Sequence, residues 1–72
     1  MSVYKVVELI GSSPDSWEKA AAVAIKKASE TIRDIRIAEV VMLDTQIENG
    51  KIIAYRTKLN ISFKVEGSDI VS

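Results

Sequence analysis

The side chains of this sequence that are best suited to chemistry are its carboxylates. The 72 residues include ten acidic residues but no cysteine and no histidine. The lack of cysteine excludes disulfides, thiolate zinc sites and cysteine nucleophiles. The lack of histidine removes the commonest general base and metal ligand. Hydrolysis by a histidine-containing triad and zinc binding by histidine are therefore excluded for one chain and for any homo-oligomer of it. Any site chemistry must therefore use oxygen ligands and carboxylates.

Acidic residues at two places could serve catalysis or metal binding. Glu39 lies within an apolar segment, where a structural salt bridge is favoured over a catalytic acid because the sequence supplies no second catalytic group. Asp44, Glu48 and Asn49 lie close together in sequence and offer oxygen ligands to a hard cation. Their spacing is not that of a calcium-binding loop, so solvated turn residues are the favoured interpretation.

A third candidate is the segment Gly11-Ser12-Ser13, which precedes an expected helix. In outline it resembles an anion-binding turn at a helix N-terminus. It lacks the glycine-rich pattern of a phosphate loop, so a simple helix cap is favoured. No motif in the sequence supports an enzyme.

The overall composition restricts the partners that the protein can have. Ten basic and ten acidic residues give a formal net charge of zero, and 47% of the residues are hydrophobic. A charge-driven nucleic-acid binder would carry a basic excess, so nucleic acid is not expected as a partner. The N-terminus lacks the pattern of a secretory signal, and the uninterrupted apolar runs are too short to span a membrane. We therefore expect a cytoplasmic protein with no membrane partner.

The longest regular pattern is the strict alternation of apolar and polar residues between positions 51 and 65. Period two over this length predicts one long strand with a buried face and a polar face. The strand is expected to run from residue 51 to 66, after a tight turn at Asn49-Gly50, and residues 67–72 are expected to form a fraying tail. The polar face carries five residues: Arg56, Lys58, Asn60, Ser62 and Lys64.

The N-terminal half predicts a strand followed by a helix. The strand is expected from Val3 to Ile10, and the helix from Pro14 to Arg33 or Asp34, with Ser13 as its cap and Pro14 in the first helical position. One stripe of the helix is apolar and mostly alanine, which lets the helix lie close to a sheet. Trp17 starts this stripe, so a role in the core or an interface is favoured over stacking on a ligand.

The segment from Ile37 to Asp44 predicts the second strand, and residues 45–51 the turn. The second strand is apolar on both sides, which indicates packing on both sides. The element order strand, helix, strand, strand predicts an α+β fold whose sheet order is first, third, second, with all neighbours antiparallel. The helix can cover only one face of this sheet. A chain of 72 residues builds a small core, so the uncovered face suggests association with other subunits.

Several short motifs in the same order resemble the dodecins, a family of small flavin-binding proteins. The matching segments are Val-Tyr-Lys-Val-Val-Glu-Leu-Ile-Gly-Ser-Ser-Pro-Asp-Ser-Trp at 3–17, the alanine-rich helix, Ile-Ala-Glu-Val-Val at 37–41 and Tyr-Arg-Thr-Lys-Leu at 55–59. The resemblance covers about residues 3–66. It implies that residues 1–72 form a single dodecin-like domain, with a three-stranded antiparallel sheet partly wrapping one helix, and that twelve copies assemble into a hollow shell.

Two positions of the sequence depart from the flavin-binding members of the family. Ile37 stands where the resemblance implies a tryptophan that stacks on the flavin ring, and Arg56 stands where it implies a glutamine that hydrogen-bonds the flavin. The chain therefore resembles a branch that lacks the stacking tryptophan. Losing an aromatic contact removes about 1 kcal/mol beyond plain burial, so weak flavin binding is expected. The resemblance also allows calcium or coenzyme A as ligands, with no motif that identifies metal-binding residues here.

These observations together favour a non-enzymatic protein that binds or stores a small ligand or cation in a shell of twelve subunits. A flavin-binding dodecin, for FMN or riboflavin, with a site altered at Ile37 and Arg56 is one alternative. A small adaptor whose uncovered sheet face binds another protein is the other. Arg56 is expected to pair with a carboxylate across a strand or subunit boundary, with Glu39 as the candidate partner, and to support assembly more than ligand recognition.

Overall fold

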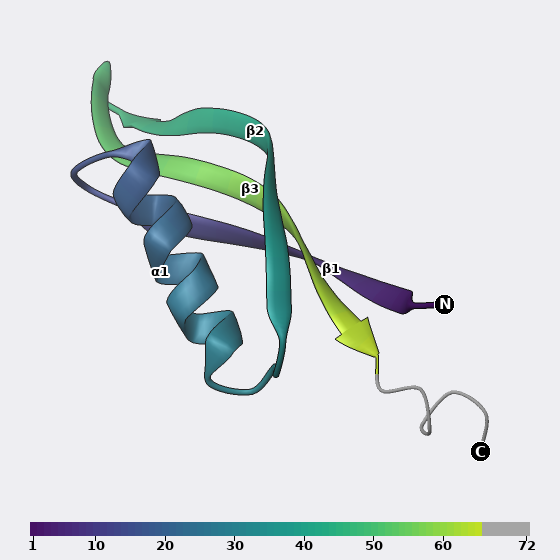
Figure 1. The fold of residues 1–72 in the computed structure, drawn as a ribbon. Coiled ribbons are helices and arrows are strands. Elements are labelled where there is room, and N and C mark those ends of the chain that lie inside the picture. Colours follow the sequence, from purple (N-terminus) through teal and green to yellow (C-terminus); the bar gives the residue numbers. More distant parts are fainter. Residues whose placement is uncertain (66–72) are drawn as a thin grey trace.

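The computed structural model describes residues 1–65, which form a three-stranded sheet and one helix (Figure 1). The elements follow the order β1 (Val3–Ser13), α1 (Trp17–Ser29), β2 (Ile35–Glu48) and β3 (Lys51–Val65). The fold class predicted from the sequence is therefore confirmed. The expected tail at 67–72 and the expected last strand residue, 66, lie outside the described residues.

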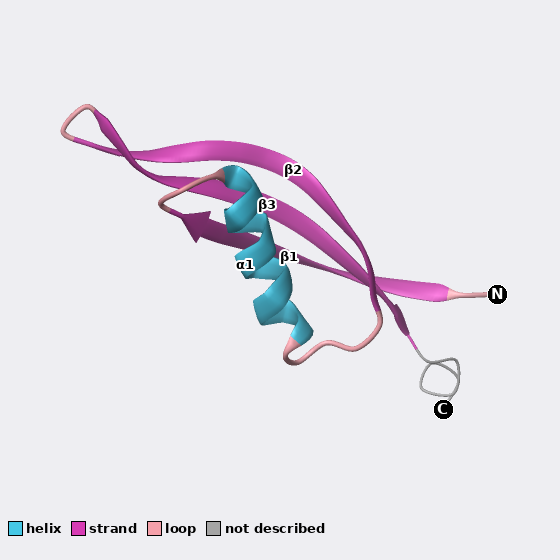
Figure 2. Cartoon of the chain, turned by 60° about the vertical axis from the view of Figure 1, so that its left-hand side comes forward, coloured by secondary structure: helices cyan, strands magenta, loops and turns pink. Residues whose placement is uncertain are grey.

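The sheet has the order β1-β3-β2, with β3 antiparallel to both neighbours, as the sequence predicted. α1 lies across one face of this sheet, and the opposite face has no cover from the described chain (Figure 2). We call the first face the helix face and the second the outer face. Among the described residues, no helix is long and apolar enough to cross a membrane.

The helix is shorter than the sequence predicted at both ends. Its cap is Ser16, which has an extended backbone and whose Oγ accepts a hydrogen bond of 3.1 Å from the N–H of Lys19. Ser13, the expected cap, lies in β1 and accepts the N–H of Asp15 instead. At the far end the N–H groups of Thr31 and Ile32 both bond to the carbonyl of Ala28. This convergence ends the regular ladder well before the expected residues 33 and 34.

The second strand is longer than predicted because the turn of the hairpin contains only two residues. Asn49 and Gly50 have φ angles of 53° and 76°, as a tight hairpin turn requires. Residues 45–48, which were expected in the turn, instead pair with β3. Bulges interrupt the register at three places, and the one between Val40 and Met42 moves Leu43 to the helix face, opposite Thr57. Simple alternation from Ile37 would place Leu43 on the same side as Ile37, so the bulge reverses the side on which Leu43 lies.

The core lies between the alanine stripe of the helix and the central strand. Its buried apolar residues are Ala20, Ala24, Ala28, Leu59 and Ile61. Small side chains on the helix let its backbone approach the sheet, and the approach is close at Gly11 of β1. A Cβ atom placed on Gly11 would lie 1.9 Å from the carbonyl oxygen of Ala20. The absence of a side chain at residue 11 is thus a packing requirement.

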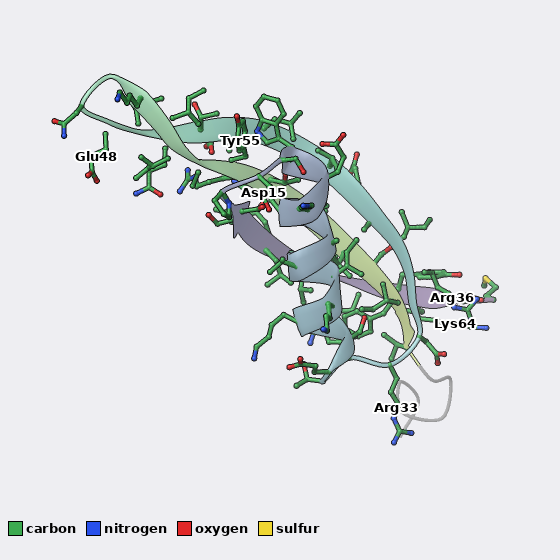
Figure 3. The ribbon with its side chains drawn as sticks, turned by 90° about the vertical axis from the view of Figure 1, so that its left-hand side faces the viewer. Asp15, Arg33, Arg36, Glu48, Tyr55 and Lys64 are labelled. Atoms are coloured by element: carbon green, nitrogen blue, oxygen red, sulfur yellow. The ribbon has the colours of Figure 1, made fainter. Side chains whose placement is uncertain are left out.

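The hairpin between β2 and β3 extends well past the helix. We call its end, residues 46–53, the hairpin arm. Figure 3 places Glu48 at the far end of the arm and Tyr55 at its base, near the first turn of α1. The described chain is accordingly elongated, with extents of 53 × 19 × 16 Å.

We predict that Gly11→Ala lowers the free energy of unfolding by about 3 kcal/mol, because the helix backbone must move away from the sheet to admit the methyl group. Urea unfolding followed by circular dichroism measures the change. Ser12→Ala, at the neighbouring exposed position, is the matched control and should change stability little. Equal stability of the two variants would contradict the close approach at Gly11.

Candidate functional site

The outer face combines a polar central strand with two apolar borders. β3 presents Arg56, Lys58, Asn60 and Ser62 on this face, because side chains alternate along a strand. Large exposed apolar side chains flank them on both sides: Tyr4, Val6 and Ile10 from β1, and Ile37 and Met42 from β2. A face of this composition suits contact with another protein surface around a polar centre.

The strongest polar interaction on this face joins Arg56 to Asp44. Arg56 Nε lies 2.7 Å from Asp44 Oδ1, and Nη2 lies 2.8 Å from Oδ2. This bidentate pairing has the geometry of a strong charge-assisted contact. The hydrogen bonds from Arg56 lower the pKa of the Asp44 carboxyl below its usual value of 3.8; desolvation opposes this effect, and the charge of Arg56 adds to it.

The prediction that Glu39 is the carboxylate partner of Arg56 is wrong within the chain. Glu39 stands opposite Asn60, whereas Asp44 stands directly opposite Arg56. From the sequence, Asp44 was expected at the end of the second strand as a solvated turn residue, with a cation ligand as the less favoured alternative. The Asn49-Gly50 turn was a signal that could have excluded Glu39, since a two-residue turn sets the register and leaves Glu39 four positions from Arg56 along the hairpin.

The same aspartate also anchors the helix. Trp17 Nε1 donates a hydrogen bond of 2.9 Å to the backbone carbonyl of Asp44, and Thr57 Oγ1 donates one of 2.8 Å to the carbonyl of Trp17. The Tyr55 ring meets the Trp17 ring edge to face, with centroids 5.1 Å apart. Trp17 thus ties the start of α1 to both strands of the hairpin, a packing role consistent with the core or interface role predicted from the sequence.

A row of oxygen-bearing side chains crosses the middle of the outer face. Asn60 of β3 is paired with Glu8 of β1 on one side and with Glu39 of β2 on the other. Lys58 Nζ lies 3.4 Å from Glu8 Oε1 in a partly exposed ion pair, which contributes little to stability. Within residues 1–65, no three Asp, Glu, His or Cys residues lie close enough together to hold a metal ion. A cation on this row would therefore need ligands beyond those of one chain.

The two positions expected to contact a ligand lie far apart in one protomer. Ile37 has 62% of its surface exposed and pairs with Ser62, near one end of the sheet. Ser62 is six positions from Arg56 along β3, a separation of about 20 Å. One chain does not bring Ile37 and Arg56 together, so a shared site would require residues from two subunits.

A shallow hollow on the helix face lies where α1 leaves β2 uncovered. It has a volume of about 330 Å³ and is mostly apolar. We call it the Trp17 hollow, and its lining residues are Trp17, Glu18, Ala21, Val40, Leu43 and Thr57. Neither the hollow nor its acidic rim was expected from the sequence, because the bulge that turns Leu43 to this side has no simple sequence signal.

We predict that the contribution of the Asp44–Arg56 pair to stability disappears in acid. The pKa of Asp44 is lower in the folded protein than its usual 3.8, so the contribution is fully present above about pH 4 and is lost as the pH falls through the folded value. Urea unfolding at fixed protein concentration between neutral pH and pH 3 measures it. Asp44→Asn should be less stable than the unchanged protein at neutral pH, and the difference should shrink in acid.

Asp15→Asn is the control for this prediction, because Asp15 pairs with Lys19 at an exposed helix position. Its effect should be small at every pH. A stability difference between Asp44→Asn and the unchanged protein that stays constant down to pH 3 would contradict the role of the ion pair.

Comparisons with known proteins identify the family of this chain. The profile of the dodecin family matches residues 3–66. Calcium dodecin from Mycobacterium tuberculosis is 49% identical over 65 residues, covering 90% of this chain and 92% of the relative.

Two solved structures have the same fold. A crystal structure of the M. tuberculosis calcium dodecin, described as calcium-chelating with a novel calcium-binding site, is 48% identical, covers 93% of this chain and 96% of its own, and has a TM-score of 0.81. The dodecin of Streptomyces coelicolor is 34% identical, covers 90% of this chain and 93% of its own, and has a TM-score of 0.86. With β1, α1, β2 and β3 arranged as described above, the chain belongs to the dodecin family of small-ligand-binding proteins.

Proposed function

We propose that this protein is a non-enzymatic subunit of a closed shell of twelve identical chains, which binds or stores a small cation or ligand between its subunits. The observation that carries the proposal is the uncovered outer face, where apolar borders from β1 and β2 flank charged and amide side chains. Covering such borders with identical copies removes apolar surface from water, with a gain of roughly 25 cal/mol per Å². The cytoplasmic location expected from the sequence stays a prediction.

Calcium is the ligand that we propose first. Glu8, Asn60 and Glu39 lie side by side across the outer face and provide carboxylate and amide oxygens, which are hard ligands of the kind that calcium prefers. Calcium takes about six to eight oxygen ligands, so the same row of a neighbouring copy, or water, would complete the coordination of the ion. Similarity to a protein described as calcium dodecin supports this choice.

A small adaptor for a different protein was the alternative from another functional class. It uses the same exposed outer face but requires that the face stay free in the isolated protein. The mass of the protein in solution therefore separates an adaptor from a shell.

Native mass spectrometry of freshly purified protein tests the shell and the cation together. Twelve copies of the 7.9 kDa chain predict a particle of about 95 kDa with closed symmetry. With calcium added, the particle should gain mass in steps of one calcium ion. Glu39→Gln should reduce calcium affinity about tenfold or more, since it removes a carboxylate charge from the site.

Glu30→Gln is the matched control, because Glu30 caps the exposed end of α1 and pairs with Lys27. It should leave both mass and calcium binding unchanged. A stable monomer at micromolar concentration would contradict the shell. A particle that takes up no calcium, or takes it up equally with Gln at position 39, would contradict the cation site.

Flavin binding by FMN or riboflavin is the alternative ligand hypothesis within the same shell. Arg56 cannot easily serve a flavin, because Asp44 already accepts hydrogen bonds from its Nε and Nη2 atoms. Replacing Arg56 alone would leave the Asp44 carboxylate without its partner. Full restoration of a flavin site would therefore involve Asp44 as well as the two departing positions, Ile37 and Arg56.

We predict that riboflavin binds weakly to the unchanged protein and that Ile37→Trp with Arg56→Gln strengthens binding, because the ring regains a stacking partner and a neutral amide. Adding Asp44→Asn should strengthen it further by removing the unpaired charge. Quenching of flavin fluorescence during titration measures the affinity. Nanomolar binding by the unchanged protein would overturn this prediction, and Ile37→Leu with Arg56→Gln is the control for the aromatic ring.

A further inference from the structure

The hairpin arm carries apolar side chains that its own chain does not cover. Ile47 and Ile52 are paired across the arm, and Ile53 follows at the adjacent bulge. All three are exposed. The arm projects past α1 into open space (Figures 2 and 3), so these isoleucines have no helix to pack against. A projecting two-stranded hairpin with an apolar surface is of marginal stability by itself.

The Trp17 hollow offers a second exposed apolar surface on the same molecule. Its walls come from Trp17, Ala21, Val40 and Leu43, and its volume of about 330 Å³ exceeds that of any one side chain. The arm cannot fill the hollow of its own chain. The antiparallel pairing continues through a bulge to the turn at Asn49-Gly50, and it carries the tip of the arm away from α1 (Figure 2).

The charges of the two surfaces are complementary. Lys51 lies at the tip of the arm, directly after the turn, and Glu18 lies at the rim of the hollow. Both are exposed. Within residues 1–65, neither of them forms an ion pair.

We propose that the hairpin arm of one copy seats in the Trp17 hollow of the next copy, with its isoleucines on Trp17 and Leu43 and its Lys51 beside Glu18. The proposal rests on the proposed self-assembly and names the surfaces that carry part of it. Donor and acceptor surfaces differ, so the contact is head-to-tail, and it closes into a ring when the rotation between copies allows. Each subunit then completes the hollow of its neighbour.

Reversal of the two charges tests the pairing. Lys51→Glu and Glu18→Lys should each raise the protein concentration at half-assembly about tenfold or more, because every contact of a symmetric ring is weakened together. The double variant should return toward the unchanged protein. Analytical ultracentrifugation over a dilution series measures all four proteins. Rescue in the double variant supports the contact, while single variants that assemble like the unchanged protein overturn it.

Disulfide trapping tests the geometry, since the chain has no cysteine of its own. Ile52→Cys protein is mixed with Ala21→Cys protein, dissociated, reassembled and oxidised. A covalent dimer of one chain of each kind is expected on a non-reducing gel. Val23→Cys replaces Ala21→Cys in the control, because Val23 is 54% exposed on α1 but does not line the hollow; it should give no such dimer.

The outcomes separate this inference from the proposed function. If the unchanged protein is a monomer, the proposal of a shell is wrong, and so is the proposal of the arm contact. If the unchanged protein forms a shell but yields neither the charge rescue nor the Ile52–Ala21 dimer, the shell stands and the arm contact is wrong. Equal trapping with the Val23 control also overturns the arm contact.

Discussion

The tie between Trp17 and Asp44 is the interaction on which the remaining architecture depends. The helix is short, and its stripe is mostly alanine, so it has little side-chain area with which to hold a long sheet. Trp17 compensates at one point. Its indole donates a hydrogen bond to the Asp44 carbonyl and packs edge to face on the Tyr55 ring, and its backbone carbonyl accepts a hydrogen bond from Thr57. These contacts fix the first turn of α1 to both strands of the hairpin where the arm begins.

Asp44 connects this anchor to the outer face. Its carbonyl accepts from Trp17 on the helix side, while its carboxylate accepts two hydrogen bonds from Arg56 on the other. One residue therefore holds the helix, β2 and β3 together at the base of the arm. This gives Arg56 a structural role within one chain, in agreement with the expected pairing across a strand.

The sequence predicted the elements better than their register, and the reason is visible in the hairpin. A two-residue turn at Asn49-Gly50 places Glu39 opposite Asn60, so counting from the turn would have rejected Glu39 as the partner of Arg56. The same counting places Asp44 opposite Tyr55, one residue short of the observed Arg56. The bulge beside Gln46 supplies the missing residue. Bulges arise from the local fit of strands to their neighbours, and no residue pattern in this segment predicts where they occur.

The exposed apolar residues show a different limit of sequence analysis. Alternation in β3 predicts which side chains share a face, and Thr57, Leu59 and Ile61 are indeed buried. The pattern in β2 has apolar residues on both sides, and only one side meets the helix. Ile37 and Met42 on the outer face are as apolar as core residues, yet they remain exposed in the single chain. Their composition is explained if the cover is another copy of the protein, because a solvent-facing strand surface would be free to be polar.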